Sequence, residues 1–464
     1  MNLRTVVFFD RYQKLHIIQF RVVSMFMKVR HILLTLFSVA WCVKSALASE
    51  IDRSGAIQSA TEATVLIKTH LKHGFLEDDQ SNGRWEGSGF LINKEHGWVL
   101  TNAHVAGFGP VELRLRFEDQ DNFSKAERLF VDSKHDVAVL EVPLEAIPAE
   151  SRPLELECDY ELVRGDSVFS IGHPEDQDFT ASLGVLSGEK DFHVDGSFYT
   201  TDLVTESGSS GGPVISENTN KVVGMMTSGF TSSDLGFLTK AKDICRITRL
   251  LEAGKNPARP RFGFQTMIDE LKLSPMVGAI FDSNLNLQIG DEIISWNGNL
   301  WHPESDGDLA DAMRGYEEPK AQLSVLRDGE ELLVDVPVTL GSSYHDRSWL
   351  FVSGLLITED AKSDAAFGMG DTDAPVLIIE SVDTDFDDNT DIELGRGSEV
   401  LKVDALEGVD LKSLYGYLAG LPEGAEIEVV GRVYDWSPEA YTTLMRHSFK
   451  VEELDCSWCV TKVR

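Results

Sequence analysis

Short runs of β-forming residues dominate the chain between residues 62 and 230, and Gly, Asn, Asp and Ser separate these runs. Repeated short strands with turn residues between them predict a β-barrel or a β-sandwich. A helical pattern over 239–253 closes the region, and the stretch 254–260, with its two prolines and one glycine, is typical of a linker. The expected strands are 65–68, 89–93, 98–101, 111–117, 137–142, 167–171 and 222–227.

Two smaller units after the linker repeat one order of elements. In each unit a glycine, Gly290 or Gly397, begins a short β-run, and a helix and a second strand follow. The repeat is weak in identity but consistent in order, so we expect two related α+β modules. The expected helices are 308–314 and 411–419, and the strands after them are 322–327 and 426–433.

The N-terminus has the layout of a secretory signal peptide. Two basic residues precede an apolar run over 32–43, and small residues follow it up to Ala48. The run is shorter than the roughly 20 apolar residues of a transmembrane helix. We therefore expect export and removal of residues 1–48, and we interpret residues 1–26 as an over-extended start. The expected parts of the chain are a signal peptide (1–48), a β-rich domain (49–254), two modules (261–340 and 348–454) and a tail (455–464).

The chain is strongly acidic, and its net charge of −34 becomes −40 without residues 1–48, which carry seven Lys or Arg and one Asp. This charge argues against a nucleic-acid partner. The acidic stretch 383–391 does not fit a calcium loop, because Asp388 stands where an EF-hand needs Gly and Leu394 where it needs Glu. The sequence thus predicts neither a metal nor an organic cofactor.

Four cysteines follow residue 48: Cys158, Cys245, Cys456 and Cys459. An oxidising compartment permits disulfides, but the sequence leaves the pairing open. Cys456 and Cys459 lack the strand-helix-strand setting of a redox motif and supply too few ligands for zinc. We expect this pair to be a local disulfide or two free thiols.

Three segments carry residues suited to nucleophilic catalysis. Ser210 lies in the run Gly-Ser-Ser-Gly-Gly-Pro, His104 follows the β-run 98–101, and Asp136 begins another β-run. A serine hydroxyl becomes nucleophilic when a histidine takes its proton, and an aspartate that accepts the second ring N–H fixes the histidine tautomer. Glycines beside Ser210 permit a tight turn in which the N–H groups of Gly208 and Ser210 form an oxyanion hole.

Each of these segments alone more often has a structural than a catalytic role. Their combination in one chain favours the catalytic role. The order His, Asp, Ser, with separations of 32 and 74 residues, is typical of a two-barrel trypsin-like domain. We therefore expect a mainly β fold, a trypsin-like double barrel followed by two smaller modules. His135 cannot pair with Asp136, because adjacent residues on a strand point to opposite faces. We expect His173 and His193 at the surface.

The segments Thr101 to Val105, Asp136 to Leu140 and Gly208 to Pro213 resemble the three signature segments of HtrA/Deg proteases, and the two modules resemble PDZ domains. The resemblance implies a periplasmic endopeptidase that acts on unfolded or misfolded proteins. It also implies trimers or larger homo-oligomers, built through residues 49–64, and a regulatory loop around 70–86.

The chain departs from the family pattern at Ser209, where these proteases usually have Asn. The oxyanion donors are backbone groups, so we expect activity to survive this change. Glu206 and Thr205 fall near the expected specificity pocket, where an acidic group would favour polar or basic substrate side chains instead of small aliphatic ones. Glu206 facing solvent is the simpler alternative.

The first module has the features of a peptide-capture site. PDZ domains add an extended peptide to a sheet edge, and Phe262, Gly263 and Phe264 would supply the backbone N–H groups that receive a terminal carboxylate. The second module has no clear equivalent loop, so we expect it to serve packing or assembly.

Two alternatives remain open. A chaperone that does not cleave would use the PDZ-like modules alone, with the triad present but never in its active arrangement. An exported enzyme similar to glutamyl endopeptidases would share the Asn-Ala-His segment, but the two repeats after residue 260 count against it.

Overall fold

The computed structural model forms two compact units, residues 1–58 and 59–464, and the fold below is that of the second. The expected signal peptide, the acidic stretch 383–391, His193 and Cys459 lie outside the described residues. Among the described residues, no helix is both long and apolar enough to cross a membrane. The structure describes residues 53–78, 82–174, 177–191, 197–227, 235–269, 274–280, 282, 284–302, 307–340, 347–361, 375–382, 395–422, 424–434, 442–451 and 454–457.

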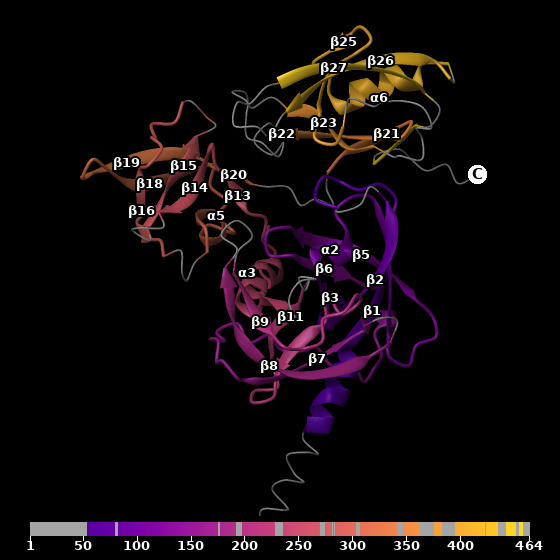
Figure 1. Ribbon diagram of the computed structural model, residues 1–464, viewed down its shortest axis with the longest axis vertical. Coiled ribbons are helices and arrows are strands. Elements are labelled where there is room, and N and C mark those ends of the chain that lie inside the picture. The colour runs from indigo at the N-terminus through magenta and orange to yellow at the C-terminus, as the bar shows by residue number, and fades with distance from the viewer. Residues whose placement is uncertain are drawn as a thin grey trace, which may run out of the picture. The chain divides into compact units, whose positions relative to one another are not determined.

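Six antiparallel strands close into a first barrel in the order β1-β2-β3-β6-β5-β4 (Figure 1). Alternate side chains of each strand face the barrel interior. Val65 and Ile67 of β1 lie opposite Phe117 and Leu115 of β4, and all four are buried in one apolar cluster. The strands are β1 (Thr64–Leu71), β2 (Gly83–Asn93), β3 (Trp98–Thr101), β4 (Val111–Phe117), β5 (Ser124–Asp132) and β6 (Val137–Glu141).

A second barrel of six strands has the order β10-β11-β12-β9-β8-β7, and helix α3 (Ala241–Glu252) follows it. Helix α3 is amphipathic and buries Ile244 and Ile247. The two barrels confirm the predicted trypsin-like architecture. The strands are β7 (Ser167–Gly172), β8 (Thr180–Asp191), β9 (Ser197–Thr201), β10 (Pro213–Ser216), β11 (Val222–Met226) and β12 (Gly236–Lys240).

A third sheet follows the barrels, in the order β14-β15-β16-β18-β19, with the short β17 (Asn299–Leu300) beside β16. Strand β14 lies at one end of this sheet and β19 at the other. A separate short pair joins β13 (Pro260–Arg261) to β20 (Thr339–Leu340). The remaining elements are β14 (Phe264–Asp269), β15 (Ser274–Ile280), β16 (Glu292–Trp296), helix α5 (Leu309–Ala312), β18 (Lys320–Arg327) and β19 (Glu330–Pro337).

The last sheet repeats this order as β22-β23-β24-β26-β27, which agrees with the repeat in the sequence. Aspartate caps the helix in both modules: Asp308 accepts the N–H of Asp311, and Asp410 accepts the N–H of Ser413. The elements are β21 (Trp349–Val352), β22 (Leu355–Ala361), β23 (Pro375–Val382), β24 (Glu399–Val403), β25 (Leu406–Glu407), α6 (Leu411–Ala419), β26 (Glu426–Tyr434), β27 (Thr442–Lys450) and β28 (Leu454–Cys456).

The two sheets differ at one edge. Strand β21 forms a tight hairpin with β22, in which Val352 pairs with Leu355 and Trp349 with Thr358. Ser353 and Gly354 both have positive φ, at 46° and 87°, as a two-residue hairpin turn requires. The outer edge of β22 is therefore covered, and β28 continues the sheet beyond β21.

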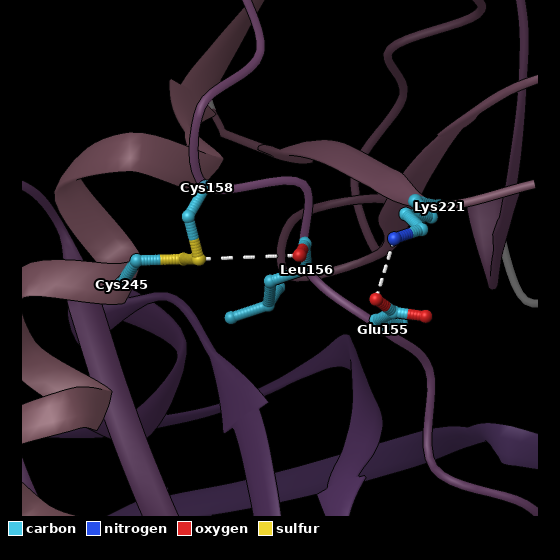
Figure 2. The surroundings of a disulfide bond; sticks show 5 residues. All are labelled: Glu155, Leu156, Cys158, Lys221 and Cys245. Carbon is cyan, nitrogen blue, oxygen red and sulfur yellow. Dashed lines mark hydrogen bonds and ion pairs between the residues drawn. A yellow bond between two sulfur atoms is a disulfide. The ribbon is translucent and has the colours of Figure 1, made fainter. Parts of the chain in front are cut away.

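A disulfide joins Cys158, in the segment between the barrels, to Cys245 on α3 (Figure 2). Next to it, the N–H of Glu157 donates to the carbonyl of Val222, and the N–H of Val222 donates to the carbonyl of Glu155. Lys221 and Glu155 add an exposed ion pair of 2.5 Å. The segment is thus fastened to both β11 and α3. Cys456 is also disulfide-bonded.

Removing the Cys158–Cys245 bond should destabilise the protein, because the bond closes a loop with a sequence separation of 87 residues and so restricts the unfolded chain. We expect the Cys158→Ser/Cys245→Ser variant to lose about 2 to 4 kcal/mol of unfolding free energy, measured by urea denaturation. Lys221→Gln, which removes the neighbouring exposed ion pair, should cost less than about 1 kcal/mol. Equal losses in both variants would contradict this account.

Candidate active site

His104 and Asp136 are in direct contact. His104 lies in the short helix α2 (Ala103–Ala106), directly after β3, and Asp136 precedes β6. The His104 Nδ1 atom lies 2.8 Å and 3.0 Å from the two carboxylate oxygens of Asp136. The backbone N–H of His104 also donates to Asp136 Oδ1, at 3.0 Å. The carboxylate therefore fixes both the ring and the backbone of His104.

Two further side chains hold Asp136, and the sequence analysis missed both. Thr227, which follows β11 of the second barrel, donates its hydroxyl to Asp136 Oδ2 at 2.5 Å. Asn102 is fully buried and donates its amide Nδ2 to the carbonyl of Asp136 at 3.0 Å. Asp136 has a φ of 52°, a left-handed conformation that aspartate tolerates better than most residues. Asp136 thus receives donors from both barrels.

Ser210 lies on the second barrel, in the loop that leads into β10. Gly208 and Gly211 on either side of it have φ values of 96° and 88°, as expected for a tight turn around a nucleophile. A Cβ atom on Gly211 would lie 2.0 Å from the carbonyl oxygen of Ser88, so the loop approaches β2 closely. Within the described part of the chain, neither the Gly208 nor the Ser210 N–H donates a hydrogen bond, which leaves both available to a ligand.

Ser88 on β2 is a further residue at the nucleophile loop that the sequence analysis missed. It is fully buried, its N–H donates to the carbonyl of Ser210 at 2.7 Å, and its hydroxyl donates to the carbonyl of Gly208 at 2.7 Å. Its own carbonyl accepts the hydroxyl of Thr101, at the end of β3. No sequence signal marks these contacts, because the partners are far apart along the chain.

The expectation of a surface position for His173 is wrong. Its side chain packs edge-on against the ring of Phe179, and the residue is 2% exposed. Its Nδ1 atom lies 3.0 Å from the hydroxyl of Ser88. Burial disfavours the charged imidazolium and lowers the pKa of His173 to about 4. A polar residue between Gly172 and Pro174 suggested an exposed loop, whereas the fold buries it behind Gly208.

His135 lies apart from the Asp136 carboxylate, as predicted. Its Nδ1 atom is 3.2 Å from Asp132, and its Nε2 atom is 3.4 Å from Asp311. Burial opposes the charged form, but the carboxylates of Asp311 and Asp132 prevail and raise the pKa of His135. Arg314 adds an ion pair to Asp132 at 2.5 Å. His135 therefore belongs to a buried ionic cluster.

Glu206 and Thr205 are the residues expected near the specificity pocket. Glu206 and Ser209 line a cavity of about 320 Å³, together with polar side chains that include Ser170, Gln177 and Ser182. Thr205 lies instead beside β12, where a Cβ atom on Gly236 would come within 2.4 Å of its methyl group. The specificity role expected of Glu206 and Thr205 stays a prediction.

Phe262, Gly263 and Phe264 lie directly before and at the start of β14. The rings of Phe262 and Phe264 stack with centroids 5.4 Å apart. The carbonyl of Gly263 accepts the N–H of Asp282, and a Cβ atom on Gly263 would lie 2.5 Å from the Asp282 Cβ. The position therefore requires glycine for a close approach.

Comparison with known proteins agrees with the double barrel. A family model for a trypsin-like peptidase domain matches residues 87–225. A probable DegP-like periplasmic serine endoprotease of Hahella chejuensis is 29% identical over 59% of this chain and 62% of its own length. The chloroplastic protease Do-like 1 of Arabidopsis thaliana is 28% identical over 51% of this chain and 58% of its own length. The chain thus contains a trypsin-like peptidase domain and is similar to HtrA/Deg serine proteases.

The fold is similar to that of a solved protease. A solved structure of the HtrA-type protease AlgW with a decapeptide superposes with a TM-score of 0.50 at 20% identity, over 62% of this chain and 98% of that one. The chain spans less than two thirds of the length of the two HtrA/Deg relatives above.

The close approach of Gly211 to β2 can be tested by comparing alanine variants of Gly211 and Gly165. Gly211 and Gly165 both have positive φ, at 88° and 85°, but a Cβ atom on Gly165 would meet nothing within 4 Å. Gly165→Ala should therefore cost about 1 to 2 kcal/mol, the penalty of the backbone conformation alone. Gly211→Ala should cost about 3 kcal/mol or more, because its methyl group overlaps the Ser88 carbonyl. Urea denaturation would measure both, and equal costs would exclude the overlap.

Proposed function

We propose that this chain is a serine endopeptidase in which Ser210, His104 and Asp136 act as the catalytic triad. The contact between His104 Nδ1 and the Asp136 carboxylate, at 2.8 Å, is the observation that carries the proposal. It leaves Nε2 as the ring nitrogen that can take a proton from a serine. The packing of the Ser210 loop against Ser88 and Thr101, close to His104 in sequence, supports Ser210 as that serine.

The reaction proceeds through an acyl-enzyme. His104 takes the hydroxyl proton of Ser210 as Ser210 Oγ attacks the substrate carbonyl, and Asp136 stabilises the resulting imidazolium. The N–H groups of Gly208 and Ser210 stabilise the oxyanion. His104 then gives the proton to the leaving amine, and water hydrolyses the ester by the same steps in reverse.

Replacement of Ser210 tests the assignment. Ser210→Ala should abolish degradation of casein and labelling by a fluorophosphonate, because no other group supplies the nucleophile. The thermal midpoint of unfolding should stay within a few degrees of the wild type, since the hydroxyl lies at a partly exposed site. Equal casein degradation by both proteins would defeat the proposal. Absence of degradation by both, with suppressed aggregation of a denatured client, would favour a chaperone.

For the first module we propose capture of extended peptide C-termini. Strand β14 ends its sheet and pairs only with β15 among the described strands, so it offers an edge to which a peptide can be added. The Phe262 to Phe264 segment at the start of β14 is suited to receive the terminal carboxylate. In the second module β21 covers the corresponding edge of β22, which supports a role in packing or assembly.

Peptide binding to the full-length Ser210→Ala protein tests this capture. By calorimetry, a heptapeptide with an apolar C-terminal residue and a free carboxylate should bind at least about 10-fold more tightly than its C-terminal amide, because the amide loses charge-assisted hydrogen bonds. Phe262→Ala should weaken binding. Leu333→Ala, an exposed apolar position on the opposite edge strand β19, should not. Equal affinity for the acid and the amide would contradict carboxylate capture.

The same proposal covers the location of the protein, its substrates and its assembly. Relatives named as periplasmic serine endoproteases support an exported location and action on unfolded or misfolded proteins. The Cys158–Cys245 disulfide fits an oxidising compartment. Assembly into trimers or larger homo-oligomers through residues 49–64, of which 53–63 are helical, belongs to this proposal as well.

A further inference from the structure

We propose that Ser88 and His173 are positioning residues that hold the Gly208 carbonyl, and with it the oxyanion hole, through a chain of two side-chain hydrogen bonds. The inference rests on the proposed proteolytic function and adds two residues to it. Neither side chain reacts. Their role is to fix the loop on which the nucleophile and both oxyanion donors lie.

Ser88 uses all of its polar groups at the junction of the two barrels. Its N–H and its hydroxyl donate to the carbonyls of Ser210 and Gly208, which flank Ser209. Its carbonyl accepts the hydroxyl of Thr101 at 2.7 Å, three residues before His104. One buried residue therefore connects the strand that leads to the base with the loop that carries the nucleophile.

The direction of the hydrogen bonds determines the tautomer of His173. A serine hydroxyl has one proton, and Ser88 donates it to the Gly208 carbonyl. Ser88 Oγ must therefore accept a proton from His173 Nδ1, 3.0 Å away. His173 is then neutral, with the proton on Nδ1 and a bare Nε2. Nε2 is buried and has no partner among the described residues, which suits a nitrogen without a proton.

The backbone of His173 restrains Gly208 from a second side. A Cβ atom on Gly208 would lie 2.1 Å from the carbonyl oxygen of His173, and Gly208 has a φ of 96°. Gly208 is thus held between the carbonyl of His173 and the hydroxyl of Ser88. Rotation of this residue would redirect its N–H, which is one of the two proposed oxyanion donors. The side chain of His173 keeps Ser88 oriented, and Ser88 keeps the Gly208 carbonyl oriented.

Oxyanion stabilisation acts on the transition state and not on substrate binding, so kinetics separate this role from ordinary packing. The assay uses the full chain, a fluorogenic peptide derived from a casein site that the wild type cleaves, and a peptide aldehyde of the same sequence. The aldehyde forms a tetrahedral adduct whose oxyanion occupies the hole.

Ser88→Ala should lower kcat about 10- to 100-fold, leave KM within about 2-fold, and weaken the aldehyde by the same factor as kcat. His173→Leu, which removes the donor to Ser88, should lower kcat about 10-fold. His173→Asn should restore kcat to within about 3-fold of the wild type, because its amide N–H can take the place of Nδ1–H.

Ser216→Ala is the matched control. Ser216 is also fully buried, and its hydroxyl donates to Asp166, away from the nucleophile loop. It should lose stability without a change in kcat. If Ser88→Ala behaves as Ser216→Ala does, or if His173→Asn is as slow as His173→Leu, the inference is wrong. If Ser88→Ala does not fold, the comparison of the two His173 variants decides. A wild type that neither cleaves the peptide nor binds the aldehyde would overturn the proposed function itself.

Discussion

The carboxylate of Asp136 is the point on which the site depends, because it accepts hydrogen bonds from both barrels. His104 on the first barrel donates its ring and backbone N–H groups, and Thr227 on the second donates its hydroxyl. The two barrels bury their apolar side chains in separate clusters, so neither cluster alone fixes the distance between His104 and Ser210. Polar contacts across the junction between the two barrels fix this distance. A partly buried carboxylate without these donors would be costly, so its set of partners favours one relative placement of the barrels.

The sequence predicted the bounds of some elements and missed other elements entirely. Strands β3 and β4 and helix α6 have the predicted bounds, because alternating or amphipathic patterns and clear turn residues delimit them. Strands β5, β8 and β9 were missed, since charged and small residues interrupt their alternation. Within the candidate site, motif and order singled out Ser210 together with His104 and Asp136, and the structure brings the last two into contact. Thr227, Ser88 and His173 act across 91, 120 and 85 residues of chain, and a single sequence contains no signal for such contacts.

The two C-terminal modules share one order of elements but differ at one edge of the sheet. Both sheets keep the same strand order and the same aspartate cap on their helix. They diverge at the edge before the first long strand. In the first module Gly263 approaches Asp282 closely between β13 and β14, and β14 pairs only with β15 among the described strands. In the second, a two-residue turn at Ser353 and Gly354 folds β21 onto β22. The sequence of the second module shows no recognisable peptide-binding loop. In the structure, the corresponding edge strand β22 is already paired with β21.

The departure at Ser209 can be judged from the way in which the nucleophile loop is held. Ser209 is almost fully buried, and its backbone forms hydrogen bonds within the loop. Its N–H donates to the carbonyl of Glu206, and its carbonyl accepts the N–H of Gly212. The neighbouring restraints also use backbone groups of the loop, with Ser88 bonded to the carbonyls of Gly208 and Ser210. A loop held through its main chain tolerates a change of side chain at one position, provided that the glycines remain. The backbone contacts of the loop therefore do not depend on the side chain at position 209, whereas Gly208 and Gly211, each with another carbonyl at the place of a Cβ atom, cannot be replaced without strain.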